Sequence, residues 1–159
     1  IKTELNLLKK VGAKIKLFKN SINIKGPERI KSIKNITTKE YPGFPTDLAP
    51  QFMVLLCKAS GTSSITENIF QGRFLHAMEL QRLGAKITIK NRTAKIEGNT
   101  NFIAAEVMSS DLRASAALVL AGIVSKGNTV VTRVYHCDRG YENFENKLKK
   151  IGVKIKRLK

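Results

Sequence analysis

Acidic and aromatic residues are both scarce in this chain. It has 12 aspartates and glutamates against 29 lysines and arginines, and the resulting net charge of +17 makes an anionic partner the first candidate. Aromatic residues make up only 6% of the chain, and no aromatic run is interleaved with arginine to stack bases. We therefore expect no nucleic-acid partner and favour a lysine-rich surface around an anion-binding cleft.

Cysteines and long apolar runs are also few. Cys57 and Cys137 form no CxxC pair, which argues against a zinc knuckle or a disulfide framework and favours a reducing compartment. The longest apolar run, residues 114–124, is about half a membrane span and is interrupted by Ser115 and Gly122. Because nothing resembles a signal peptide either, we expect a cytoplasmic protein with no membrane partner.

Proline occurs only four times, always between Pro27 and Pro50. This grouping predicts loop or edge strand over residues 27–45. A domain linker is the alternative, but no change in composition accompanies the prolines. The length of 159 residues and the hydrophobic content of 42% favour one domain, residues 1–159, with a single core.

One stretch recurs three times along the chain. Residues 80–89 (LQRLGAKITI) have near copies at residues 8–17 and 148–156, and their glycines, Gly12, Gly84 and Gly152, lie 72 and 68 residues apart. Each copy has apolar residues at helical spacing, then the glycine, then apolar and lysine residues in alternation. The pattern predicts a helix, a left-handed glycine cap and a half-buried strand, in a unit of about 70 residues.

The segments between the glycines follow a common plan. A helix starting near Thr46 or Asp47, with Pro50 in its first turn, is followed by a strand, a loop bearing Arg73, and a second helix. A helix capped by Ser110-Asp111 is followed by a strand, a loop bearing Arg139, and a helix. The remaining expectations are hairpins at 13–25 and around 90–92, strands at 63–69, 102–108 and 127–134, and helices at 73–83, 112–124 and 141–150. Repeated βαβαββ units bury their helices only by associating, which favours a three-unit α/β assembly.

Four segments carry a family resemblance, and the resemblance extends over nearly the whole chain. They resemble the C-terminal part of the UDP-N-acetylglucosamine 1-carboxyvinyltransferases, which are enolpyruvyl transferases. The 5-enolpyruvylshikimate-3-phosphate synthases share that fold, but FPTD and DRGYE look more like the amino-sugar enzymes. The segments are YPGFPTD at 41–47, TENIF at 66–70 with Arg73-Phe74, SDLRAS at 110–115, and YHCDRGYE at 135–142.

The resemblance implies a fold and a reaction. The fold is an inside-out α/β barrel of three βαβαββ units with pseudo-threefold symmetry. This chain is then most of one barrel domain, and the N-terminal partner domain of the same enzyme is missing. The reaction transfers the enolpyruvyl group of phosphoenolpyruvate to the 3-hydroxyl of UDP-N-acetylglucosamine, the first committed step of peptidoglycan precursor synthesis. It requires no cofactor and no metal.

The resemblance also assigns roles to five residues. Asp47 corresponds to the general base that binds the sugar hydroxyl, and Ile69 to a backbone contact with the nucleotide sugar. Asp111 orients groups near the reaction centre, while Arg113 and Arg139 bind phosphoenolpyruvate, whose anionic groups suit guanidinium forks. From the residues alone, Asp47 is more simply a helix cap, and the two arginines could pair with Asp111 and Asp138 at the surface.

Other reactive residues have simpler explanations. His76 and Glu79 lie three apart on one predicted helix, but no third metal ligand has suitable spacing, so we expect a surface or packing role. Cys57 is expected in the core, and Cys137 nearer the site. The family's mobile-loop cysteine is absent, so the chain carries half of an active site and is expected to be inactive alone. The alternatives are a shikimate-type transferase and a basic, non-catalytic anion- or nucleic-acid-binding module.

Overall fold

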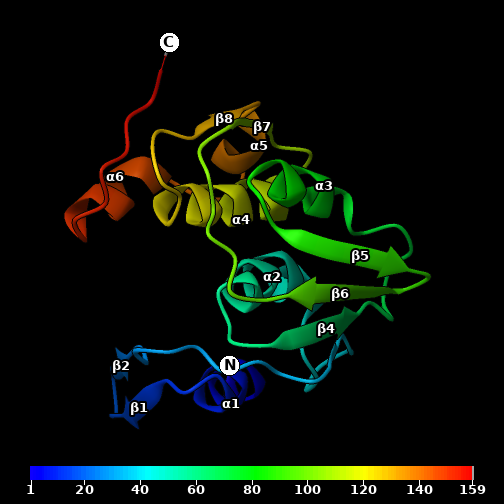
Figure 1. The fold of residues 1–159 in the computed structure, drawn as a ribbon. Coiled ribbons are helices and arrows are strands. Elements are labelled where there is room, and N and C mark those ends of the chain that lie inside the picture. The colour runs from blue at the N-terminus through cyan, green and yellow to red at the C-terminus, as the bar shows by residue number, and fades with distance from the viewer. Residues whose placement is uncertain (159) are drawn as a thin grey trace.

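A computed structural model describes residues 1–158, in which short sheets surround a group of packed helices (Figure 1). None of these helices has the length and apolar character needed to cross a membrane. The helical elements are α1 (Lys2–Lys10), the 3-10 turn η1 (Thr46–Leu48), α2 (Ala49–Cys57), α3 (Leu75–Arg82), α4 (Leu112–Ile123), α5 (Tyr135–Asp138) and α6 (Phe144–Lys150). The strands are β1 (Lys14–Leu17), β2 (Ile22–Lys25), β3 (Ile36–Thr37), β4 (Thr62–Thr66), β5 (Lys86–Lys90), β6 (Thr93–Glu97), β7 (Glu106–Met108) and β8 (Val130–Thr132).

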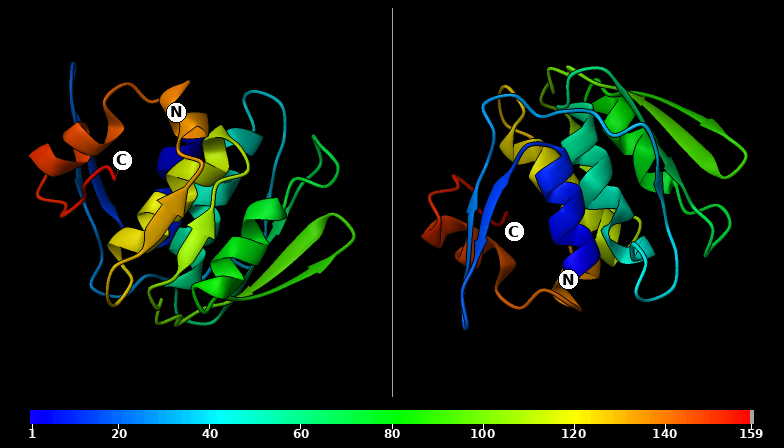
Figure 2. Two further views of the ribbon diagram at one scale, coloured as in Figure 1. Left: turned by 90° about the horizontal axis from the view of Figure 1, so that it is seen from above. Right: turned by 90° about the horizontal axis from the view of Figure 1, so that it is seen from below.

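Helix α2 lies at the centre, between α4 on one side and α1 on the other (Figures 1 and 2). It is apolar on nearly all sides, and Met53, Leu56 and Cys57 are fully buried. A helix that is apolar all round needs neighbours on every face, and here α1, α4 and the main sheet supply them. The core is therefore continuous from Leu7 of α1, and Val11 directly after it, to Leu118 of α4.

The main sheet has the strand order β3-β4-β6-β5. Strands β5 and β6 form the predicted hairpin around residues 90–92, and β4 joins β6 antiparallel with Ile65 opposite Ala94. Strand β3 pairs parallel to β4, and this register brings Thr38 beside the end of β4. Two smaller sheets, β1-β2 and β7-β8, complete the strands.

The predicted glycine stops are confirmed. Gly12, Gly84 and Gly152 follow α1, α3 and α6 with φ values of +105°, +94° and +91°. After α3, the Ala85 amide donates to the Leu80 carbonyl at 3.0 Å, which closes the last turn. A side chain at positive φ is strained, so glycine is the residue that ends these helices most easily.

Several strand predictions are wrong in detail. No strand follows Gly152 within the described residues, although residues 153–156 alternate, so only one complete helix-strand-helix-hairpin passage is present. Strand β1 is largely exposed rather than half-buried, with Leu17 61% accessible, because no layer within residues 1–158 covers the hairpin. The predicted strand 63–69 ends at Thr66, and the short helix α5 was not predicted.

Candidate active site

Asp47 lies between two arginines. Its Oδ1 accepts a hydrogen bond from Arg73 Nη2 at 3.2 Å, and its Oδ2 accepts one from Arg113 Nη2 at 2.6 Å. The Asp47 side chain is half-exposed, so a ligand can reach it. The hydrogen bond to Asp47 is the main reason why the pKa of Arg113 is raised. The three residues thus form a site open to solvent, in which the Asp47 carboxylate lies between the guanidinium groups of Arg73 and Arg113.

The prediction that Thr46 or Asp47 caps the following helix is wrong. Both belong to η1, and neither Pro45, which precedes η1, nor Leu48, which precedes α2, caps through its side chain. The extra 3-10 turn moves the start of α2 past Asp47, so its carboxylate is free to meet the arginines. Pro50 lies in the first turn of α2, as predicted.

An open hollow of about 520 Å³ surrounds this arrangement. Asp47, Ile69 and Arg113, all three predicted from the sequence, line it, whereas Asp111 and Arg139 lie outside its wall. The guanidinium of Arg73 stacks over the Phe70 ring at 4.6 Å. The full lining is Lys39, Glu40, Tyr41, Pro45, Thr46, Asp47, Ile69, Phe70, Arg73 and Arg113.

Asp111 is the N-cap of α4, as predicted. Its Oδ1 accepts from the backbone amides of Arg113 at 2.8 Å and Ala114 at 2.9 Å, while Ser110 donates to Oδ2. Burial by itself raises the pKa of this carboxyl, but these hydrogen bonds outweigh burial and lower it. Asp111 therefore acts here on Arg113 indirectly, because it fixes the turn from which that side chain extends.

Neither arginine forms the surface pair that was the alternative. Arg113 bonds to Asp47, and Arg139 approaches His136 Nδ1 at 3.0 Å. Asp138 is instead bound by both amino groups of Arg157, at 2.9 and 2.6 Å. Arg139 is exposed and follows α5, which packs on α4. It is thus available to a ligand near the start of α4.

Sequence reasoning left two participants without a role. In the sequence, Arg73 is only the counterpart of Arg139 in the repeat. Its position in a loop is the one local sign of a functional role. Glu67 stood inside a quoted motif, but nothing local indicated that its carboxylate is 2% accessible. Its two hydroxyl partners, Thr38 and Thr46, are 29 and 21 residues away, so no local spacing reveals them.

His76 is buried at 3% accessibility, consistent with the predicted packing role. Its Nε2 has no hydrogen-bond partner, and burial lowers its pKa to about 4, with Asp111 raising it and Arg73 lowering it. Cys57 is in the core as expected, where burial raises its thiol pKa to about 12. Among residues 1–158, no three His, Cys, Asp or Glu side chains are grouped to hold a metal ion.

Comparisons with known proteins agree with one another. Residues 1–148 match the sequence profile of EPSP synthase (3-phosphoshikimate 1-carboxyvinyltransferase). The chain is 60% identical over 158 residues to a UDP-N-acetylglucosamine 1-carboxyvinyltransferase from Pelagibacter ubique, covering 99% of this chain and 38% of the relative. It is 51% identical to one from Desulfosudis oleivorans, with the same coverage of both.

Solved structures show the same fold. The enolpyruvyl transferase NikO from Streptomyces tendae matches with a TM-score of 0.90 at 25% identity, covering 98% of this chain and 36% of that one. An EPSP synthase from Acinetobacter baumannii matches with a TM-score of 0.73 at 18% identity, with the same coverage. The chain therefore spans less than two fifths of the length of the relatives that it matches.

Proposed function

Because the chain belongs to the EPSP synthase family, whose profile matches residues 1–148, we propose that it supplies part of the active site of an enolpyruvyl transferase. The donor is phosphoenolpyruvate and the acceptor is the 3-hydroxyl of UDP-N-acetylglucosamine. The observation that carries the proposal is the Asp47 carboxylate held between Arg73 and Arg113 in an open hollow. The names of the relatives at 60% and 51% identity support the choice of acceptor.

The proposed chemistry is an addition followed by an elimination. Asp47 removes the proton of the acceptor hydroxyl, whose oxygen bonds to C2 of phosphoenolpyruvate while C3 gains a proton from an acid outside this chain. Loss of a proton from C3 then restores the double bond as the C2–O bond to phosphate breaks. Inorganic phosphate leaves, and the enolpyruvyl ether remains on the sugar.

The arginines bind the donor in this proposal. Arg113 and Arg139 each present a planar fork that matches a carboxylate or a phosphate with two parallel hydrogen bonds. Arg73 joins them, because its guanidinium already faces the hollow beside Asp47. Ile69 lines the same hollow and contacts the nucleotide sugar through its backbone. Asp111 keeps the start of α4, and with it Arg113, in place.

We further propose that residues 1–159 are most of one inside-out barrel domain of βαβαββ units with pseudo-threefold symmetry. The central helices with sheets outside them agree with this arrangement (Figure 2). The N-terminal partner domain would supply the acid and the remaining anion ligands. The reaction would take place in the cytoplasm, at the start of peptidoglycan precursor synthesis.

The experiment uses a chimera, in which this chain replaces the matching segment of the Pelagibacter ubique relative. We expect phosphate release when phosphoenolpyruvate and UDP-N-acetylglucosamine are both present, and none above buffer from the isolated chain with the same substrates. A well-folded chimera without activity would contradict the proposal for this chain. Phosphate release by the isolated chain would contradict the need for a partner domain.

Transfer to 3-phosphoshikimate is the second candidate, because the matched family profile carries that name. A second chimera, built on the Acinetobacter baumannii EPSP synthase, tests it. Both chimeras are given both acceptors. We expect only the first to turn over, and only with the amino sugar. Turnover of 3-phosphoshikimate by the second chimera would favour transfer to that acceptor.

A further inference from the structure

Glu67 is a buried carboxylate at the end of β4, next to the candidate site. Only 2% of its surface is accessible. Its Oε1 accepts from the Thr38 hydroxyl at 2.8 Å and from the Ile69 and Phe70 amides at 2.8 and 3.1 Å. Its Oε2 accepts from the Thr46 hydroxyl at 2.7 Å. Glu67 therefore joins three separate segments: the end of β3, the turn that carries Asp47, and the loop that carries Ile69.

None of these four donors is a cation, which is unusual for a buried charge. Removing a carboxylate from water costs several kcal/mol unless hydrogen bonds replace the lost hydration. Here burial raises the pKa of Glu67, but the hydrogen bonds from Thr46, Phe70, Thr38 and Ile69 outweigh it and lower the pKa. The carboxylate thus stays ionised, and an apolar side chain in its place would leave all four donors without this acceptor. Its charge needs an explanation other than packing.

The bond to Thr46 sets the direction of a short chain of hydrogen bonds. The Thr46 hydroxyl has one hydrogen, and an ionised Glu67 can only accept it. The Thr46 oxygen is then left to accept, and Arg73 Nη1 lies 3.3 Å from it. The other amino group of Arg73, Nη2, bonds to Asp47 Oδ1 at 3.2 Å. Arg73 therefore donates a hydrogen bond to Thr46, and Thr46 donates one to Glu67. This order of hydrogen bonds holds the guanidinium of Arg73 against the Asp47 carboxylate.

The hydrogen bonds to Glu67 Oε1 hold another part of the wall of the hollow, the loop that carries Ile69 and Phe70. The amides of Ile69 and Phe70 point into the protein toward Glu67, and that of Asn68 donates to the Thr38 hydroxyl at 2.9 Å. With all three amides directed inward, the loop keeps the Ile69 carbonyl group for a ligand. Ile69 can then meet a hydroxyl or amide hydrogen of an acceptor through its carbonyl oxygen, but cannot donate to one.

We propose that Glu67 is a positioning residue of the transferase site, which orients Arg73 on Asp47 through the Thr46 hydroxyl and holds the Ile69 loop. This inference rests on the proposed function. It assigns no contact with substrate to Glu67 itself. The two branches act on different steps: Thr46 and Arg73 on donor binding and on proton removal by Asp47, the Ile69 loop on binding of the acceptor.

Glu67→Gln in the Pelagibacter ubique chimera separates the two branches. The amide oxygen can replace Oε1 and keep the Ile69 loop, while the NH₂ group donates to Thr46 and reverses that bond. We expect kcat to fall about 10- to 100-fold, since small misplacements at a reacting centre cost this much, with KM for the acceptor within about threefold. The control is Glu97→Gln, an exposed glutamate on β6. Unchanged kcat and KM in Glu67→Gln would overturn the proposal.

A double-mutant cycle tests whether Glu67 acts through Thr46. Thr46→Val removes the hydroxyl, whereas Thr46→Ser keeps it and should retain kcat within about threefold. We expect Glu67→Gln combined with Thr46→Val to be little worse than either single variant, because both break the same chain of bonds. If the fold losses in kcat of the two single variants multiplied in the double variant, Glu67 and Thr46 would act independently, and the proposal would be overturned. If Glu67→Gln fails to fold, the Thr46→Val and Thr46→Ser pair tests the same relay.

One measurement does not depend on activity. Hydrogen exchange at the Ile69 and Phe70 amides should be protected in the parent chimera and in Glu67→Gln, and at least 10-fold faster in Glu67→Ala. If the parent chimera has no transferase activity, the proposed function fails while this result still reports on Glu67. Equal protection in Glu67→Ala would show that Glu67 does not hold the loop.

Discussion

At the scale of single residues, the contacts of Asp47 contribute little to the stability of the fold but much to the proposed chemistry. The pair with Arg113 is short, at 2.6 Å, but half of the Asp47 side chain is exposed, as is about a third of the Arg113 side chain. Exposed ion pairs contribute roughly 0–1 kcal/mol to folding, because water already solvates both charges. Substitutions here should therefore change catalysis far more than folding.

Asp47→Asn in the chimera is the direct test of the base. The amide keeps the shape and the Oδ1 contact but cannot take the proton of the acceptor hydroxyl. We expect turnover to fall by roughly 10²–10⁴, with the melting temperature within a few degrees of the parent. Steady-state kinetics and thermal unfolding measure the two effects. An unfolded variant whose remaining folded fraction is fully active would show a purely structural role.

Arg113→Lys and Arg139→Lys should differ from each other. Lysine keeps the charge but loses the planar fork, so both variants should raise KM for phosphoenolpyruvate about 10-fold or more. Of these two arginines, only Arg113 contacts Asp47, so only Arg113→Lys should also lower kcat. Varying each substrate separately in the chimera measures this split. If both variants changed kcat equally, the Arg113–Asp47 contact would contribute nothing to catalysis.

His76 should make the protein sensitive to mild acid. Its folded pKa is about 4 against an ordinary 6.5, so between these values the unfolded chain binds a proton that the native state does not. The free energy of unfolding should therefore fall as the pH drops from 6.5 to 4, by about 3 kcal/mol in total. NMR titration of the ring gives the pKa, and His76→Phe should flatten the stability profile in this window. Glu67 and Asp111, whose pKa values are lowered from 4.5 and 3.8, add to the loss of stability only at the acid end of this window and below it.

Residue roles could be predicted from the sequence only where the cause is local. Asp111 caps α4 as expected, because its partners are two and three residues away. Asp47 had the same local pattern but a different outcome, since its partners lie 26 and 66 residues away. The family resemblance assigned Asp47, Ile69 and Arg113 to one site, and the structure brings these three residues to one hollow. The resemblance gave no role to Arg73 or Glu67, whose contacts depend on the folded chain.

At the scale of elements, Gly98 is where two backbones approach most closely. It follows β6, and a Cβ added there would lie 1.9 Å from the Ala59 carbonyl oxygen and 2.6 Å from that of Gly61. Gly98→Ala should therefore destabilise the protein by about 1–3 kcal/mol, because the backbone must shift. The matched control is Gly26→Ala, where an added Cβ meets nothing within 4 Å and the cost should stay within about 0.5 kcal/mol.

Chemical unfolding of the two variants beside the parent chimera measures this difference. A Gly98→Ala variant as stable as Gly26→Ala would mean that the loop between α2 and β4 does not lie against Gly98 as described.

Helix ends were easier to predict than strands for a physical reason. A glycine at positive φ ends a helix by itself, and three such ends were predicted correctly. A strand needs a partner as well as an alternating pattern. Residues 153–156 alternate like residues 86–89, but only the latter have a neighbouring strand within residues 1–158.

At the scale of the whole molecule, nothing within residues 1–158 covers the outer face of the hairpin β1-β2. Leu17, Ile22 and Ile24 are 61%, 40% and 51% accessible. The chain spans 38% of the Pelagibacter ubique relative, so the rest of that protein can cover them in the chimera. Amide hydrogens of β1 and β2 should exchange at least 10-fold more slowly in the chimera than in the isolated chain. Equal exchange would mean that the hairpin stays at the surface in the complete protein.

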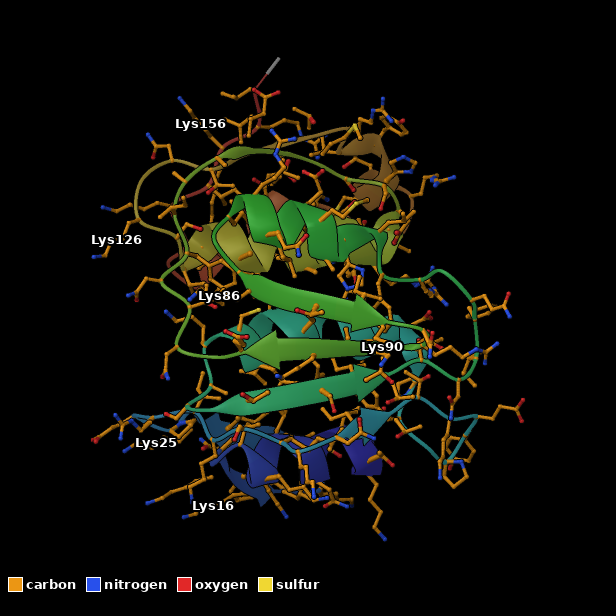
Figure 3. The ribbon with its side chains drawn as sticks, turned by 45° about the vertical axis from the view of Figure 1, so that its right-hand side comes forward. Lys16, Lys25, Lys86, Lys90, Lys126 and Lys156 are labelled. Carbon is orange, nitrogen blue, oxygen red and sulfur yellow. The ribbon has the colours of Figure 1, made fainter. Side chains whose placement is uncertain are left out.

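The distribution of lysine has a consequence for this uncovered hairpin. Lysines project outward along the whole molecule, from Lys16 and Lys25 on the hairpin to Lys126 and Lys156 (Figure 3). A two-stranded sheet with exposed apolar residues has free edges that invite pairing with other chains. Lys14 and Lys16 on β1 and Lys25 on β2 place like charges along the hairpin, so two hairpins can approach only against electrostatic repulsion. The charge therefore protects the exposed hairpin from edge-to-edge aggregation.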